Sequence, residues 1–565
     1  MSRWIGISIV ALGGLVAGCS GGARDYDLVV HNAMIWTGNP DQPEASVLAV
    51  RGDEFVYVGD EMPEPSRIGR RTQVIDARQA RVVPGLIDAH LHLVSGGLQL
   101  TRLNLRDAPD RAAFIERIAA RAKATPQGRW ILGGRWSTES WPDPAQPDKS
   151  WIDSITGDRP TLLHRMDGHG ALANSAALKL AGITRDGPPD PPGGLIERDA
   201  KTGEPTGILK ESAIGLVSRH VPTPSAGELD TALAAAMHHA NSHGITAAHT
   251  MSPWSDYAVL LRADDADRLT LRVRMYVMES DWEPYLDKIG RRRGDERLRI
   301  CGFKQFMDGS LGSRTASMTD PYADQPANHG VLREVMYADG GAQPDATHLT
   351  RMCEAALDEG FSPAIHAIGD QANRIVLDTY EQVRRSVEAQ SDEHEFPLRI
   401  EHAQHLLPED IERFAKLGVV ASMQPLHKAD DGRYAVGAIG IERCRTSYAF
   451  RSLIESGAVV AFGSDWPVVS LNPMEGIHAA VTGRTLNDQT FVPEQNITSE
   501  QALRAYTMGA ARAAGDEGKL GVIRPGALAD FVILDADILS IRSAAIRFVR
   551  VNQTFVGGRR VYTRE

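Results

Sequence analysis

The chain has 565 residues, of which 42% are hydrophobic and 24% charged, and its formal net charge is −12. This composition is ordinary for a folded globular protein and excludes a disordered chain, a collagen and a multi-pass membrane protein. At about 100–200 residues per domain, the length allows one large domain with additions, or several domains. The acidic balance argues against nucleic acid as the main partner.

The first nineteen residues have the pattern of an export signal. Arg3 is the only charge in residues 1–18, and the apolar run 4–16 is shorter than the span of about 20 residues that crosses a bilayer. The sequence Val16-Ala17-Gly18-Cys19 resembles the lipobox of bacterial lipoproteins, although an ordinary signal peptide followed by a chance cysteine is an alternative. We expect residues 1–18 to be a signal peptide. The mature chain would then start at a lipidated Cys19, and Ser20 favours an outer-membrane anchor facing the periplasm.

Both ends of the remaining chain contain short strand-like segments. The N-terminal ones are residues 27–36 and a hairpin formed by 47–50 and 55–58, and the C-terminal ones are residues 529–534, 546–551 and 554–562. We therefore expect residues 24–84 and 516–565 to form one β-sandwich from the two ends of the chain.

The central part alternates short apolar runs with helical patterns, which predicts βαβ units and a parallel sheet. The helical patterns include residues 226–242, 347–359, 371–389 and 447–456. There are eight such apolar runs, and all except 271–278 lead into a polar residue of chemical interest. The runs are 81–88, 244–248, 271–278, 298–303, 361–365, 398–401, 419–423 and 458–464. Residues 85–515 are therefore predicted to form an α/β fold, a (β/α)₈ TIM barrel with its active site at the carboxyl ends of the strands.

Residues 100–222 are too long for one crossover, and we expect them to be an inserted α/β subdomain after the first strand. Four tryptophans in this segment indicate either an apolar ligand surface or the core of the insertion itself. They are Trp130, Trp136, Trp141 and Trp151.

Four predicted strand ends carry metal-ligand side chains. His90 and His92 lie on the same side of an extended chain because side chains alternate along a strand. His366, His402 and Asp465 follow later strands. Nitrogen and oxygen ligands of this kind suit Zn²⁺, with Mn²⁺ and Fe²⁺ as alternatives.

Several segments together resemble the amidohydrolase superfamily, and in particular the branch that includes N-substituted formamide deformylases. The matching segments are residues 83–92, 167–178, 304–313, 366–370, 401–404, 463–467 and 526–530. The resemblance implies two divalent metal ions. His90 and His92 would bind one of them with Asp465, and His366 and His402 would bind the other. Lys304, carboxylated by CO₂, would bridge the two ions; the alternative is an unmodified lysine that pairs with Asp308 or a substrate anion.

The resemblance also implies a reaction and a set of substrate contacts. A metal-activated hydroxide would attack a carbonyl carbon, and Asp465 would carry the proton to the leaving amine, so that the C–N bond of an amide, formamide or cyclic amide is hydrolysed. His169, Asn174, His249 and Arg314 are candidate substrate-binding residues. Each has a structural alternative, such as a helix N-cap for Asn174 and loop structure for Arg314.

Other protein classes fit less well. A heterocycle deaminase on the same barrel would usually lack the bridging lysine, and a non-catalytic ligand-binding lipoprotein would be expected to lose ligands such as Asp465. Residues 168–173 fit the G-x-G-x-x-A pattern of dinucleotide-binding sites. Such a site requires a strand in the following segment, and the Pro/Gly-rich stretch 187–194 that stands there cannot form one. The chain contains neither a P-loop nor a G-x-S-x-G motif, so we expect a small-molecule substrate and no nucleotide cofactor.

Overall fold

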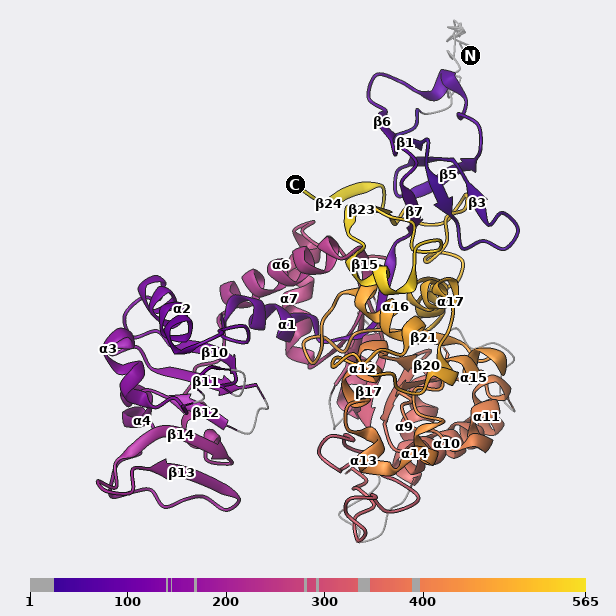
Figure 1. Cartoon of the computed structure of the whole chain (residues 1–565). Helices are drawn as coiled ribbons and strands as arrows, with labels where there is room; N and C mark the ends of the chain where they lie inside the picture. Colours follow the sequence, from indigo (N-terminus) through magenta and orange to yellow (C-terminus); the bar gives the residue numbers. More distant parts are fainter. Residues whose placement is uncertain are drawn as a thin grey trace, which may run out of the picture.

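The protein is described here from a computed structural model, which covers residues 25–138, 141–143, 145–166, 170–278, 282–290, 294–333, 346–388 and 397–565 (Figure 1). The predicted signal peptide and Cys19 lie outside the described residues. No helix within the described ranges is both long and apolar enough to cross a membrane.

The centre of the molecule is an eight-stranded parallel sheet rolled into a barrel. Every strand is buried along almost its whole length, as expected when helices cover a parallel sheet. The strands follow chain order, and the predicted (β/α)₈ fold class is confirmed. They are β8 (Leu86–Leu91), β15 (Ile245–Ser252), β16 (Arg272–Val277), β17 (Leu298–Phe306), β18 (Ser362–Ala367), β19 (Arg399–His402), β20 (Val420–Met423) and β21 (Val460–Phe462).

The first and last strands meet where the candidate ligands lie. The Asp465 N–H donates to the His90 carbonyl at 2.6 Å, and the His92 N–H donates to the Trp466 carbonyl at 2.8 Å. The carboxylate of Asp88 accepts the backbone N–H groups of both His90 and Ser464. The end of β8 is thereby fixed against the segment that carries Asp465.

Helices surround the barrel between its strands. The helix α6 (Ala226–Ser242) begins after Ser225, which forms a reciprocal capping box with Glu228, and it buries Leu233 and Met237 against the barrel. The other helices outside the insertion are α1 (Leu93–Thr101), α7 (Trp254–Asp265), α8 (Glu283–Gly290), α9 (Thr347–Asp358), α10 (Asp370–Glu388), α11 (Ile411–Lys416), α12 (Pro425–Asp431), α13 (Ala435–Ile439), α14 (Ile441–Cys444), α15 (Phe450–Glu455), α16 (Pro473–Thr482), α17 (Ser499–Arg504) and α18 (Ala510–Arg512). The bounds of α6 are those of the predicted helix.

A β-sandwich built from both ends of the chain lies beside the barrel. One sheet has the order β5-β4-β1-β6, and the other has the order β24-β23-β22-β7-β2-β3. A shared core that includes Leu48, Phe55 and Phe531 packs between the two sheets. The strands are β1 (Leu28–His31), β2 (Met34–Trp36), β3 (Glu44–Ala45), β4 (Val47–Arg51), β5 (Glu54–Gly59), β6 (Gln73–Asp76), β7 (Arg81–Pro84), β22 (Phe531–Leu534), β23 (Val551–Val556) and β24 (Arg559–Thr563).

Two predicted strands of this part are wrong in detail. Residues 27–36 form two strands in different sheets, because Asn32 adopts a left-handed conformation (φ 53°) that turns the chain. Residues 546–551 are not one strand: the first three belong to a 3₁₀ helix, Ser543–Phe548, that buries Ile546, and only Val551 lies in a strand. The run 81–88 is likewise divided, with β7 in the sandwich and β8 in the barrel.

The insertion forms a sheet of its own to one side of the barrel (Figure 1). Phe114 lies at the centre of its core, in edge contacts with Trp136, Trp141 and Trp151, so three of the four tryptophans serve the core. The sheet has the order β13-β14-β12-β11-β10-β9. Its elements are β9 (Leu103–Asn104), α2 (Arg111–Ala124), β10 (Ile131–Trp136), α3 (Asp153–Thr156), β11 (Thr161–Arg165), β12 (Gly170–Ala173), α4 (Ser175–Leu180), β13 (Gly194–Arg198), β14 (Pro205–Glu211) and α5 (Ile214–Ser218).

Candidate metal centre

The six predicted metal ligands lie together in one cavity at the carboxyl end of the barrel. The cavity has a volume of about 340 Å³ and is lined by all six, which are His90, His92, Lys304, His366, His402 and Asp465. Five come from the ends of β8, β17, β18 and β19, and Asp465 follows β21. The barrel therefore gathers residues that are up to 375 positions apart in the sequence.

Three histidines are held so that Nε2 faces the cavity. The Nδ1 atom of each is hydrogen bonded: His90 to the Glu401 carboxylate at 2.5 Å, His92 to the Met251 carbonyl at 2.8 Å, and His402 to Gln424 Oε1 at 2.7 Å. All three partners are acceptors, so Nδ1 carries the proton and Nε2 keeps its lone pair. This is the usual orientation of metal-binding imidazoles.

His366 is oriented the opposite way. Its Nε2 donates to the Gly309 carbonyl at 3.1 Å and lies 3.4 Å from Asp308 Oδ1, which leaves Nδ1 as the free nitrogen. The Asp308 carboxylate is itself fixed by the backbone N–H groups of Ser317, Ile368 and Gly369. Asp308 thus orients His366 and makes no ion pair with Lys304 among the described residues.

Asp465 faces the histidines from the other side. Its Oδ1 lies 3.1 Å from His92 Nε2 and 3.5 Å from His90 Nε2. Backbone strain accompanies this position, because Asp465 has φ 58° and His402 has φ 75°. The convergence of imidazole lone pairs on a carboxylate fits a divalent ion of the zinc type.

Lys304 is 2% exposed and has an apolar neighbour in place of a counter-ion. Its Nζ lies 3.8 Å from the centre of the Phe306 ring, and no carboxylate of the described residues lies within 4.0 Å of it. Burial lowers the pKa of Lys304 to about 8, although Glu401 and Asp465 oppose that shift. Burial therefore favours the neutral amine at this position more than at an exposed lysine.

One cavity residue, His427, was missed by the sequence analysis. Its ring stacks on that of His402 at 6.1 Å and 6°, and its Nε2 lies 3.7 Å from Asp465 Oδ2. That nitrogen is buried and has no hydrogen-bond partner among the described residues. The seventh strand run ends at Gln424, and His427 lies beyond it, on the helix α12 that begins at Pro425. A search limited to the ends of the strand runs therefore does not find His427.

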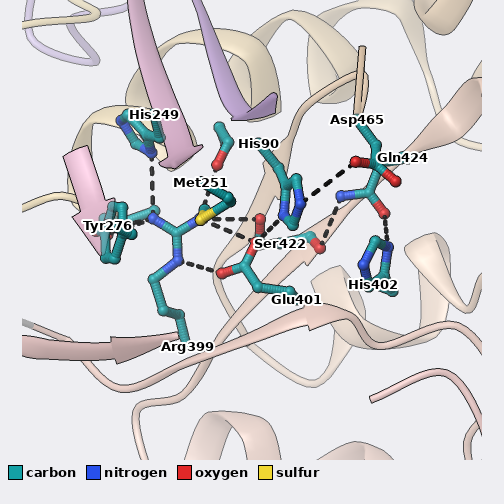
Figure 2. A network of polar contacts seen from close by, with 12 residues as sticks. His90, His249, Met251, Tyr276, Arg399, Glu401, His402, Ser422, Gln424 and Asp465 are labelled. Carbon is teal, nitrogen blue, oxygen red and sulfur yellow. Dashed lines mark hydrogen bonds and ion pairs between the residues drawn. The ribbon is translucent and has the colours of Figure 1, made fainter. Parts of the chain in front are cut away.

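A buried polar network lies behind the ligands (Figure 2). The Glu401 carboxylate accepts hydrogen bonds from His90 Nδ1 and from Nε (2.5 Å) and Nη2 (3.1 Å) of Arg399. Burial alone would raise the pKa of Glu401, but the adjacent Arg399 and His90 hold it below its ordinary value. Arg399 is fully buried and also donates to the carbonyl of Ala89 beside His90. The network fixes the position and tautomer of His90.

Three of the four predicted substrate-binding residues, Asn174, His249 and Arg314, do not line this cavity. His249 is buried behind it, and its Nδ1 accepts from Arg399 Nη1 at 3.1 Å. Arg314 forms a two-pronged ion pair with Asp324 and donates to the Leu311 carbonyl. His169 lies outside the described residues.

Asn174 belongs to the core of the insertion. It is 0% exposed and caps α4 by accepting the N–H of Ala177, and it also accepts the N–H of Thr161. Its amide group donates to Thr156 and Arg159. All of its hydrogen-bonding groups are thus used within the insertion, which agrees with the helix-cap alternative and leaves no group for a substrate.

Comparisons with known proteins agree with this geometry. The sequence matches the Amidohydrolase family over residues 73–562. It is 38% identical over 552 residues to Protein LONG AFTER FAR-RED 3 of Arabidopsis thaliana. The aligned region covers 95% of this chain and 91% of that protein. It is 28% identical over 549 residues to N-substituted formamide deformylase of Arthrobacter pascens, with coverages of 94% and 97%.

A solved structure has the same fold. The crystal structure of an uncharacterised metal-dependent hydrolase from Pyrococcus furiosus matches with a TM-score of 0.72 and 28% identity, over 91% of this chain and 100% of that chain. Barrel, ligands and relatives together define a metal-dependent hydrolase. The chain belongs to the amidohydrolase family, as the sequence motifs predicted.

Proposed function

We propose that this protein hydrolyses the C–N bond of an amide, formamide or cyclic amide with two divalent metal ions, most simply Zn²⁺. The proposal is carried by one observation: three imidazoles, those of His90, His92 and His402, each have Nδ1 fixed by a protein acceptor and lie around a cavity that Asp465, Lys304 and His366 also line. Bound divalent ions would lower the pKa of water and polarise a carbonyl group.

Lys304 is proposed to bridge the two ions as a carbamate. The ammonium form first gives up a proton. The neutral amine then adds to the carbon of CO₂ and loses a second proton, so that a cation that would repel the metal ions becomes a carbamate anion on a long arm. The burial of Nζ and its lack of a nearby carboxylate support this role. In this arrangement His90 and His92 would hold one ion with Asp465, and His366 and His402 would hold the other.

The chain's own residues supply the proton transfer. Asp465 is proposed to take a proton from the attacking water and deliver it to the leaving nitrogen. The unpartnered Nε2 of His427, 3.7 Å from Asp465 Oδ2, is placed to hydrogen bond to the substrate carbonyl oxygen as negative charge develops on it.

The same proposal places the enzyme outside the cytoplasm. Residues 1–18 would direct export, and a lipid on Cys19 would anchor the protein, with the outer membrane as the expected site. The flexible Ser20-Gly21-Gly22 segment would separate the anchor from the folded part.

The reaction is tested by screening protein produced without residues 1–19. N-formyl and N-acyl amines and cyclic amides are incubated with metal-loaded protein, metal-stripped protein and the Asp465→Asn variant, and the release of amine, or opening of the ring, is measured. Hydrolysis by the metal-loaded protein alone is expected. Release of ammonia from heterocycles with no amide hydrolysis would contradict the proposal and favour the deaminase alternative.

A further inference from the structure

A second cavity lies between the insertion and the barrel, beside the metal centre. It has a volume of about 1090 Å³, and its walls come from the end of α1, from β9 to β11 and from residues 466–471. It borders the metal cavity directly, because Val469 lines both and Trp466 and Pro467 follow the candidate ligand Asp465. Ligand sites in enzymes often lie at such boundaries between structural units.

This cleft is cationic although the whole chain is acidic. Its lining contains Arg102, Arg106 and Arg135, and the one carboxylate among its described residues is Asp107. None of the three guanidinium groups lies within 4.0 Å of a carboxylate oxygen in the part of the chain that the structure describes. Arg102 and Arg106 are exposed to solvent along the cleft and Arg135 is half-buried, so the three guanidinium groups leave a positive charge that an anion can reach and neutralise.

The arginines are close enough to influence one another. Burial and the charge of Arg106 both lower the pKa of Arg135, and burial lowers that of Arg102. Burial and the charge of Arg102 also lower the pKa of His164, which lines the same cleft. The positive charges of the three arginines thus lie near one another, and no carboxylate of the described residues pairs with them.

The backbone of β10 directs Arg135 into the cleft. The pairing of β10 with β11 shifts register between Gly134 and Trp136, so that Arg135 is the extra residue of a bulge with φ 63°. Bulges of this kind re-aim a side chain, and strained backbone in a non-glycine residue is typical of functional positions. Arg135 Nη1 donates to the Pro467 carbonyl at 3.3 Å, two residues after Asp465.

Apolar surface accompanies the charge. Leu100, which is 44% exposed, lines the cleft together with Leu103, Leu132 and Trp466. The glycines at 133 and 134 let β10 pack closely against its neighbouring strands, because a Cβ there would meet the backbone of Leu103 and His164. The cleft therefore suits an apolar body that ends in an anionic group.

We propose that this cleft binds the anionic end, a carboxylate or a phosphate, of a substrate whose C–N bond lies in the adjoining metal cavity. The assignment to the substrate rests on the proposed amide hydrolysis, whereas the anion site itself does not. Guanidinium groups bind both anions through paired N–H donors.

The anion site is tested by calorimetric titration of metal-free protein with benzoate, phenyl phosphate and the neutral benzamide. Without metal ions in the adjoining cavity, the probes cannot bind to a metal, so the result is independent of the proposed hydrolysis. We expect at least one anion to bind about tenfold or more tightly than benzamide, because hydrogen bonds between charged groups are stronger than those to a neutral amide. The tighter of the two anions identifies the class.

Variants locate the binding. Arg102→Gln and Arg135→Gln are each expected to lower the affinity for the anion by about tenfold and to leave that for benzamide unchanged. Arg71→Gln, at an exposed position of the β-sandwich, is the matched control and should behave as wild type. Metal content after reloading confirms that the variants are folded. Equal affinity for anions and benzamide, no anion binding up to the solubility limit, or equal loss in all three variants would overturn the proposal.

Discussion

The Glu401→Gln substitution tests the network that orients His90. Glu401 accepts from both His90 and Arg399, and its carboxylate is fully buried. A glutamine has the same shape, but its amide offers one acceptor oxygen and one donor group. If the oxygen stays on Arg399, the amide N–H₂ faces His90 Nδ1, whose proton must move to Nε2, the atom that faces the cavity.

Two magnitudes follow from this geometry. Loss of a hydrogen-bonded partner behind a metal ligand typically lowers metal affinity about 10–100-fold. Removing the charge also leaves the Arg399 guanidinium buried without its counter-ion, which costs about 3–5 kcal/mol in the free energy of unfolding. Both effects are expected although Glu401 itself is not a predicted ligand.

The assay has two parts. Metal affinity is measured by competition with a chromogenic chelator, and stability by urea unfolding of the metal-free protein. Glu412→Gln is the control, because Glu412 pairs with Lys416 at 2.8 Å on the exposed face of α11, where an ion pair contributes about 0–1 kcal/mol. Wild-type metal affinity and an unchanged unfolding midpoint in Glu401→Gln would refute the reasoning.

Three further variants test other parts of the structure. His427→Ala should lower kcat by about 10²–10³-fold at unchanged metal content, as for a lost donor to a developing oxyanion; a loss of bound metal would instead make His427 a ligand. Asn174→Ala should make the insertion more sensitive to protease, because the lost cap and unpaired buried groups cost about 1–3 kcal/mol each, with metal content unchanged; resistance equal to wild type would contradict its place in the core. Cys19→Ala in the full-length protein should prevent lipid labelling and release the protein from the membrane fraction, and lipid labelling that persists in this variant would contradict the anchor.

The barrel and its ligands were predictable because parallel strands and the active-site end of this fold follow simple rules. Buried strands appear as apolar runs, and candidate ligands such as His90 and His366 lie where those runs end. The family resemblance then identified Lys304, for which the run alone gave no chemical role.

Other features depend on contacts that no local pattern encodes. His427 enters the cavity from a helix after its strand, so a search of strand ends misses it. Asn174 lies in a segment that matches the family, yet all of its hydrogen bonds lie within the insertion. The arginines of the cleft come together only through the sheet order of the insertion and its placement against residues 466–471.

The count of metal ions per chain tests the central claim most directly. Protein without residues 1–19 is loaded with Zn²⁺ in bicarbonate, and its metal content is compared with that of Lys304→Met and of Lys428→Met. Lys428 is an equally buried lysine that contacts Val492 and Asn496 and does not line the cavity. We expect two bound ions per chain in the wild type and in Lys428→Met, and at most one in Lys304→Met. A single ion in all three proteins would contradict the bridged centre.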